Sequence, residues 1–257
     1  MTPATAVWPP AHAEAGHRDQ LFSGRPLPRA GHVLAVTARP GQESAELGRL
    51  LYAFRRRGTS VALLSLTRGE ASPLNSTWER LEVIRPWELQ VAASLLGISV
   101  LMVADYADGG LNRYPAAELT ERVRRAIRAH AADLLLVIDP AGSDRARGES
   151  DAHKPTRSDP TRSDPARDDA AVARAVCAAA GQAGIPVLAR MPRAARSGWH
   201  VDLGADAAAA RAVQRAALAA HASQAGAGPG TQRRMDRQDD REQMRWLVPP
   251  RRMFGLA

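Results

Sequence analysis

The sequence His32-Val-Leu-Ala-Val-Thr-Ala38 is a short apolar run, and Ser60-Val-Ala-Leu-Leu-Ser-Leu-Thr67 is a second run of the same kind. Between them, residues from about Glu43 to Arg57 have apolar side chains at helical spacing, and Gly58 follows as a stop signal. A strand, a helix and a strand in this order are typically joined by a right-handed crossover, with the two strands parallel. This stretch therefore predicts the beginning of a parallel sheet that is covered by helices.

The same alternation of strands and helices continues along the chain. Continuous apolar runs are typical of strands that are buried on both faces. The expected helices cover Trp78–Leu96, Ala116–His130, Asp169–Ala183 and Ala207–Gln224, and the expected strands cover Ser99–Ala104, Asp133–Ile138 and Ile185–Ala189. We therefore expect an α/β fold, a three-layer α/β/α sandwich with a mostly parallel, Rossmann-like sheet and functional loops at the carboxyl ends of its strands.

Composition divides the 257 residues into three parts. Residues 1–30 contain several prolines and little apolar periodicity, so we expect a flexible N-terminal arm. Residues 31–224 form one domain with a polar insertion at about 143–167, which contains the repeated sequence Thr-Arg-Ser-Asp-Pro. Residues 225–257 form an arginine-rich C-terminal tail, which we expect to be weakly ordered.

The charge and the apolar content of the chain exclude some classes of function. Hydrophobic residues make up 45% and charged residues 24%, which is typical of a folded globular protein. The formal net charge of +8 comes almost wholly from scattered arginines with few aromatic residues among them, so nucleic acid is not an expected partner. No stretch reaches the roughly 18 apolar residues that cross a bilayer, and we expect a cytoplasmic protein without a membrane partner.

The turn after the first predicted strand reads Arg39-Pro-Gly-Gln-Glu-Ser44. It resembles the His-Pro-Asp-Asp-Glu-Ser signature of the PIG-L/LmbE family of zinc-dependent de-N-acetylases. Segments that resemble later parts of the family follow in the same order, namely Leu66–Ser72, Arg85–Glu88, Asp105–Leu111, Asp139–Ser143, His200–Asp202 and Ala219–Gln224. The resemblance covers about residues 31–224, with Arg241–Pro249 as a further candidate segment, and it implies the LmbE-like version of the predicted fold.

The residues that would bind zinc differ from the family pattern. The resemblance implies zinc ligands at the first histidine and second aspartate of the signature and at a later histidine, with the first aspartate as general base. These ligand positions hold Arg39, Gln42 and Arg167, and Gly41 takes the place of the base. A guanidinium is protonated and has no electron pair for a metal, whereas zinc needs imidazole, thiolate or carboxylate ligands. We therefore expect no bound zinc or other cofactor, and no catalytic residue.

The positions on the substrate side of the family's site retain suitable residues. The resemblance implies sugar-facing roles for Glu70, Arg85 and Asp108, and we add Arg39 and Glu43 from the signature turn as expected substrate-binding residues. An alternative interpretation is that Glu70 and Arg85 form a structural ion pair at the end of the sheet. The sequence leaves both interpretations open.

The leading hypothesis is a degenerate member of the family, a pseudoenzyme that has lost zinc-dependent N-deacetylation and retains a ligand-binding pocket. Its expected partner is a small molecule, either an amino-sugar conjugate or an anion. An anion such as a carboxylate or phosphate would bind between Arg39 and Arg167, if both arginines face the pocket.

The alternative hypothesis is an active enzyme with a non-standard metal site. Such an enzyme would hydrolyse the linear amide C–N bond of an N-acetyl amino-sugar conjugate or a specialised metabolite. Its metal would need new ligands, because at least three protein ligands in a fixed geometry are usual for catalytic zinc. The candidates are His153, Asp159, Asp164, Asp168, Asp169 and Glu43.

Overall fold

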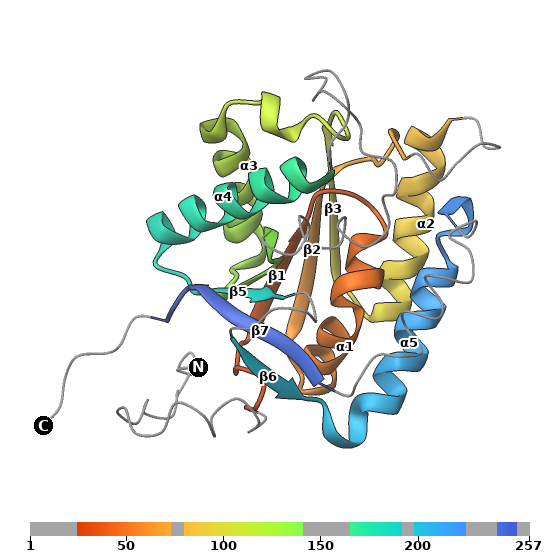
Figure 1. Ribbon diagram of the computed structural model, residues 1–257, viewed down its shortest axis with the longest axis vertical. Helices are drawn as coiled ribbons and strands as arrows, with labels where there is room; N and C mark the ends of the chain where they lie inside the picture. Colours follow the sequence, from red (N-terminus) through yellow and green to blue (C-terminus); the bar gives the residue numbers. More distant parts are fainter. Residues whose placement is uncertain (1–24, 73–79, 141–164, 192–197, 225–240, 251–257) are drawn as a thin grey trace, which may run out of the picture.

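The computed structural model describes residues 25–72, 80–140, 165–191, 198–224 and 241–250 (Figure 1). In this part of the chain, one seven-stranded sheet has the strand order β3-β2-β1-β4-β5-β7-β6. The strands are β1 (His32–Thr37), β2 (Ser60–Thr67), β3 (Val100–Tyr106), β4 (Leu134–Ile138), β5 (Val187–Arg190), β6 (Trp199–Asp202) and β7 (Arg241–Val248). The sheet therefore begins in the segment that the two apolar runs identify.

Helices cover both faces of the sheet, which confirms the expected α/β sandwich (Figure 1). The helices are α1 (Gly48–Arg56), α2 (Leu81–Leu96), α3 (Ala116–His130), α4 (Pro165–Ala183) and α5 (Ala207–Ala219), with a π-helical turn η1 (Glu43–Leu47) before α1 and a 3-10 turn η5 (Ala222–Gln224) after α5. Helices α1, α2 and α5 cover one face, and α3 and α4 cover the other.

Strand β1 shows why the sheet is buried on both sides. Leu34 and Val36 pack in the core cluster beneath α3 and α4, whereas Val33 and Ala35 pack in the cluster beneath α1, α2 and α5. Alternate side chains of a strand point to opposite faces, so a continuous apolar run supplies both cores at once. All four side chains are buried.

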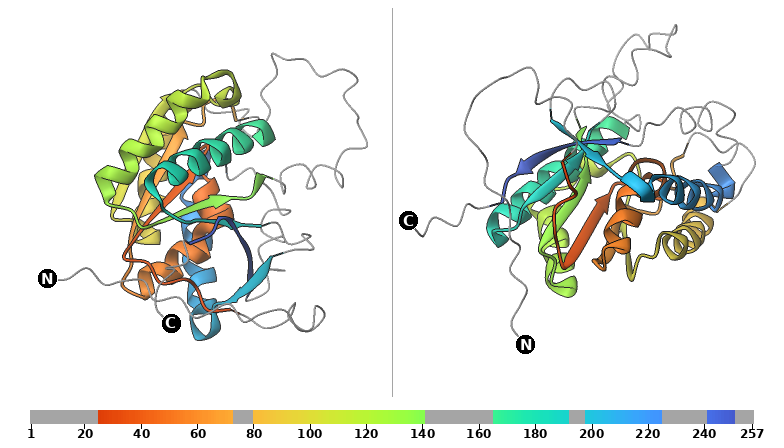
Figure 2. Two further views of the ribbon diagram at one scale, coloured as in Figure 1. Left: turned by 90° about the vertical axis from the view of Figure 1, so that its left-hand side faces the viewer. Right: turned by 90° about the horizontal axis from the view of Figure 1, so that it is seen from below.

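The sheet is mostly parallel, as expected, but its last two strands differ from the prediction. Strands β1, β2, β3, β4 and β5 pair in parallel, whereas β7 is antiparallel to both β5 and β6 (Figure 2). Because β7 lies inside the tail that we expected to be weakly ordered, that prediction was wrong for residues 241–248. Its charges are neutralised in the fold: the buried carboxylate of Glu242 pairs with Arg49 at 2.5 Å and with Arg190 at 3.5 Å.

Two helix boundaries also differ in ways that affect the site. Helix α4 begins at Pro165 instead of Asp169, so Arg167, Asp168 and Asp169 lie in its first turns. The helix predicted up to Gln224 stops at Ala219, and the chain then turns His221 into the interior. Most of the N-terminal arm, the insertion up to residue 164 and the candidate ligands His153, Asp159 and Asp164 lie outside the described residues.

Candidate functional site

The site residues meet at the carboxyl ends of β1, β2 and β3, where α4 also begins. Carboxyl ends of neighbouring parallel strands lie at the same edge of a sheet, which is the usual place for a binding site in this architecture. The turn after β1 contributes residues 39–43, and the loops after β2 and β3 contribute Glu70 and Asp108. The first turns of α4 contribute Asp168 and Asp169.

Arg39 lies between two carboxylates that come from different elements. Its Nε is 3.1 Å from Asp108 Oδ1, and its Nη2 donates a hydrogen bond of 3.0 Å to Asp168 Oδ2. The Asp168 carboxylate also accepts hydrogen bonds from the backbone N–H groups of Gly109 at 2.7 Å and Leu111 at 2.9 Å. Burial raises the pKa of Asp168 from 3.8 to about 6, against the opposing effect of Arg39 and of these two N–H groups. The guanidinium of Arg39 is thus neutralised inside the protein.

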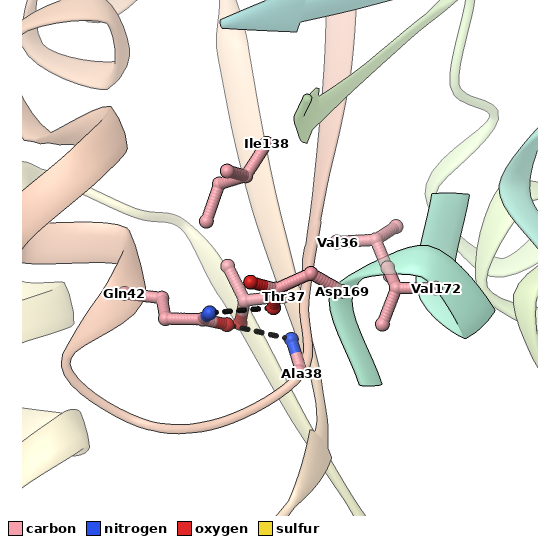
Figure 3. Close-up of a pocket in the computed structure, with 7 residues that line it drawn as sticks. All are labelled: Val36, Thr37, Ala38, Gln42, Ile138, Asp169 and Val172. Carbon is pink, nitrogen blue, oxygen red and sulfur yellow. Dashed lines mark hydrogen bonds between the residues drawn. The ribbon is translucent and has the colours of Figure 1, made fainter. Parts of the chain in front are cut away.

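Gln42 uses both ends of its side-chain amide. Its Oε1 accepts a hydrogen bond from the backbone N–H of Ala38 at 2.9 Å, and its Nε2 donates to Asp169 Oδ1 at 2.7 Å (Figure 3). The same Oε1 also accepts a hydrogen bond from the backbone N–H of Arg39 at 3.2 Å. The residue of α4 that contacts Gln42 is therefore Asp169. The sequence alignment places Arg167 at this position, and in the structure the side chain of Arg167 is exposed.

Gly41 has a backbone conformation that favours glycine. Its φ angle is +95°, a region that residues with a side chain rarely adopt. Its N–H donates a hydrogen bond of 2.8 Å to Glu43 Oε2, which closes the turn. The position that the resemblance assigns to the general base therefore has no side chain, and its backbone would be strained by an aspartate.

Glu43 points into the core and away from the edge of the sheet. Its Oε1 lies 2.7 Å from His221 Nε2 and accepts a hydrogen bond of 2.7 Å from Ser44 Oγ. Burial alone would raise the pKa of Glu43, but the hydrogen bond and the charge of His221, together with Ser44, outweigh it, so the pKa lies below its usual value. Because Glu43 and His221 are both buried, this pair joins the signature turn to the segment after α5.

Arg85 supports the backbone of the site. Its guanidinium donates hydrogen bonds to the carbonyl oxygens of Gly69 and of Pro40, the latter at 2.5 Å. Burial lowers the pKa of this side chain, which is 3% exposed. Glu70 instead accepts a hydrogen bond of 2.8 Å from the backbone N–H of Asp108. Within the described residues no ion pair joins Glu70 and Arg85, so the structure does not contain the structural ion pair that was the alternative interpretation.

A shallow recess lies beside this cluster, between the ends of β1 and β4 (Figure 3). Its lining consists of Val36, Thr37, Ala38, Gln42, Ile138, Asp169 and Val172. The expected substrate-binding residues Arg39, Glu43, Glu70, Arg85 and Asp108 are not part of this lining. The structure brings Arg39, Glu70 and Asp108 together as a hydrogen-bonded cluster beside the recess. Arg85 holds the adjoining backbone, and Glu43 is buried behind the turn.

The donor atoms of the cluster do not fit a zinc ion. Arg39 has no electron pair to offer, and the Gln42 oxygen already accepts two backbone hydrogen bonds. Both oxygens of Asp168 are also engaged, by Arg39 and by backbone N–H groups. Among the residues that the structure describes, no three histidine, cysteine, aspartate or glutamate side chains form a group that could hold a metal.

Sequence reasoning did not assign roles to Asp168 and His221. Asp168 was named only as one of several carboxylates that could rebuild a metal site, and His221 only as part of a segment that resembles the family. The hydrogen-bond partners of Asp168 are Arg39, Gly109 and Leu111, which are all distant in the sequence, so no local signal identifies its role. No local signal identifies His221, because its partner Glu43 lies 178 residues away in the sequence.

Comparisons with known proteins agree with this architecture. The family model of GlcNAc-PI de-N-acetylase (PIG-L) matches residues 34–157. The conserved protein TT1542 from Thermus thermophilus is 19% identical with a TM-score of 0.61, and the match covers 89% of this chain and 100% of TT1542. The N,N'-diacetylchitobiose deacetylase from Pyrococcus horikoshii is 15% identical with a TM-score of 0.60, covering 85% of this chain and 84% of its own.

A third similar structure is the A40926 pseudoaglycone deacetylase Dbv21, which is 18% identical with a TM-score of 0.57, covering 84% of this chain and 96% of its own. At these identities the structural likeness establishes the fold. No curated protein sequence matches the chain. No helix among the described residues is long and apolar enough to cross a membrane.

Proposed function

We propose that this chain, whose residues 34–157 match the family model of GlcNAc-PI de-N-acetylase (PIG-L), is a non-hydrolysing member of the PIG-L/LmbE family. In this proposal, a cluster of one guanidinium and two carboxylates replaces the metal site, and the protein binds its ligand without cleaving it. The observation that carries the proposal is the position of Arg39, which is held between Asp108 and Asp168 at 3.1 and 3.0 Å.

Hydrolysis of an acetamide at neutral pH needs an activated water molecule. A metal ion lowers the pKa of bound water to about 7, and a positioned base accepts its proton, a contribution of about 10²–10⁴-fold. Arg39 and Gln42 cannot ligate a metal in this way, and Gly41 provides no base. The cluster instead fixes the turn after β1, the loop after β3 and the first turn of α4 relative to one another.

The charges of the cluster favour an uncharged polar ligand over an anion. Arg39 already has two carboxylate partners, and the exposed Arg167 is not directed to Gln42, where Asp169 lies instead. An added anion would compete with both carboxylates for the same guanidinium. We therefore propose an N-acetyl amino-sugar conjugate as the ligand class, in line with the deacetylase from Pyrococcus horikoshii that is named for N,N'-diacetylchitobiose.

The test is a parallel measurement of metal content, turnover and binding. The full chain is incubated with zinc, desalted and analysed for metal, and it is then assayed for acetate release from N,N'-diacetylchitobiose. We expect substoichiometric zinc, no acetate above a heat-denatured control, and binding of the disaccharide by calorimetry. Stoichiometric zinc with zinc-dependent acetate release would refute the proposal and would support the active-enzyme alternative, especially if His153→Ala abolished it.

A matched variant tests whether these positions are the ones that determine metal binding. We expect the triple variant Arg39→His, Gln42→Asp, Asp169→His to gain zinc binding, because it places two imidazoles and one carboxylate at the positions that meet in this structure. Far-UV circular dichroism checks that the variant is folded. Equal zinc content in the variant and the original chain would count against the assignment of these positions.

A further inference from the structure

Helix α2 exposes an unusual face. Val83, Trp87, Val91 and Leu95 follow one another at intervals of four residues, and they are 39%, 70%, 51% and 45% exposed. Val100, at the start of β3, is 41% exposed. Side chains four residues apart form one ridge along a helix. We call this ridge, with Val100, the α2 stripe.

The α2 stripe differs from the exposed face of a helix that is covered only by water. Helix α3, on the other side of the sheet, has Arg124, Arg125 and Arg128 paired with Glu121 on its surface. The single lysine or arginine within α2 is Arg85, and its side chain is buried. Contiguous apolar patches of this kind on soluble proteins usually mark an interaction surface.

The α2 stripe lies at an open edge of the sheet. Strand β3 is the last strand at this end and pairs with β2 alone among the described strands. Helix α2 packs beside β3 at the same end (Figure 1). An edge strand presents unpaired backbone N–H and C=O groups, which a further strand can complete. Two surfaces that favour association, one apolar and one hydrogen-bonding, therefore lie at one corner of the molecule.

We propose that the α2 stripe is the contact surface for a second copy of this chain in a two-fold symmetric dimer. A two-fold contact uses the same patch on both copies, and a straight ridge of side chains packs against its own antiparallel copy. The absence of charge on the stripe matters here, because each copy has a formal net charge of +8 and would be repelled at a basic surface. An acidic protein partner would instead favour the arginine-rich faces.

The α2 stripe supplies about half of the surface that each partner of such a dimer needs. Trp87 and the aliphatic side chains of the stripe offer on the order of 400 Å² of apolar surface, since a whole aromatic side chain buries about 150–250 Å². A stable interface buries roughly 800 Å² on each partner. The exposed polar residues Glu82, Gln90 and Ser94, which lie on the same helix beside the stripe, supply the polar rim that such interfaces have.

The first experiment is sedimentation velocity on the full chain at several concentrations. We expect a dimer for the original chain, monomers for Trp87→Glu and for Val91→Glu, and a dimer for Ala117→Glu, which adds the same charge at an exposed position of α3. A monomeric original chain at about 100 µM would overturn the proposal. So would dimers of both stripe variants.

The second experiment does not require charged variants to fold. In a Cys177→Ser background, Val91→Cys should form a disulfide-linked dimer on mild oxidation, because a two-fold contact brings the two copies of residue 91 close together. Ala117→Cys should remain uncrosslinked. Equal cross-linking at both positions, or none at residue 91, would overturn the proposal. Because neither experiment involves the cluster at Arg39, a negative result here leaves the proposed function untouched.

Discussion

Replacing Arg39 by methionine removes the cation from a cluster of buried carboxylates and retains a side chain of similar length. Removing one partner of a buried ion pair costs about 3–5 kcal/mol, because the remaining charge is left without compensation. The side chain of Arg39 is 15% exposed and that of Asp168 is fully buried, so solvent can compensate little of this loss. We expect Arg39→Met to lower the free energy of unfolding by an amount in this range at pH 7.

The expected cost also has a definite pH dependence. In the original chain the pKa of Asp168 is about 6, so above pH 6 this carboxylate is ionised in both the folded and the unfolded state. Without Arg39 its pKa rises further, and the folded variant keeps a proton that the unfolded chain releases. The stability of the variant then falls by about 1.4 kcal/mol per pH unit above pH 6, whereas this site contributes no slope in the original chain.

Urea unfolding at pH 6, 7 and 8, followed by circular dichroism, measures both quantities. The control is the double variant Arg39→Met, Asp168→Asn, compared with Asp168→Asn alone, because an amide cannot titrate and the additional slope should disappear. A cost below about 1 kcal/mol that stays constant from pH 6 to pH 8 would show that the cluster does not compensate a buried charge, and the reasoning about Arg39 would fail.

Three other variants probe neighbouring contacts. Gly69→Ala would place a Cβ against the guanidinium of Arg85 at a φ angle of +76°, so urea unfolding should show a loss of about 1–3 kcal/mol in the free energy of unfolding. An unchanged midpoint would contradict this packing. His221→Ala leaves Glu43 buried without its partner. Because the pKa of Glu43 is lowered, its ionised form stabilises the fold above its usual pKa of 4.5. The free energy of unfolding should therefore fall by about 3–5 kcal/mol at pH 7 and by less near pH 4. The free energy of unfolding of Asp168→Asn should rise relative to that of the original chain as the pH rises, by up to about 3 kcal/mol between pH 4 and pH 7. The reason is that the pKa of Asp168 is about 6 in the folded state and 3.8 in the unfolded state. A stability difference that does not change with pH would refute this.

The sequence was most informative where the signal is local. The apolar run of β2 and the periodic residues of α3 predicted both elements with the bounds that the structure has, Ser60–Thr67 and Ala116–His130. Strand β7 was missed because its arginines and glutamate are typical of an exposed tail. Only the distant partners Arg49 and Arg190 make its Glu242 compatible with burial.

The candidate site shows the same limit. The chemistry of Arg39, Gly41 and Gln42 can be read from the signature turn alone, because the family pattern specifies what each position should hold. Their partners cannot be read in this way: Asp168 lies 129 residues from Arg39, beyond the polar insertion. The contact of Gln42 with Asp169, on the same helix, is likewise visible only in the structure.

The strand order has a consequence for how the protein is made. Strand β7 lies between β5 and β6, although it is synthesised after both of them. On the ribosome, β6 therefore lacks its partner strand until β7 has emerged, and among the described residues its other pairing is the single bridge of Val201 to Arg25. The backbone groups of β5 that face β7 stay open for the same time. Nascent chains with an unfinished sheet edge are prone to wrong pairing. A chaperone that binds extended segments would have its greatest effect during the synthesis of residues 202–248.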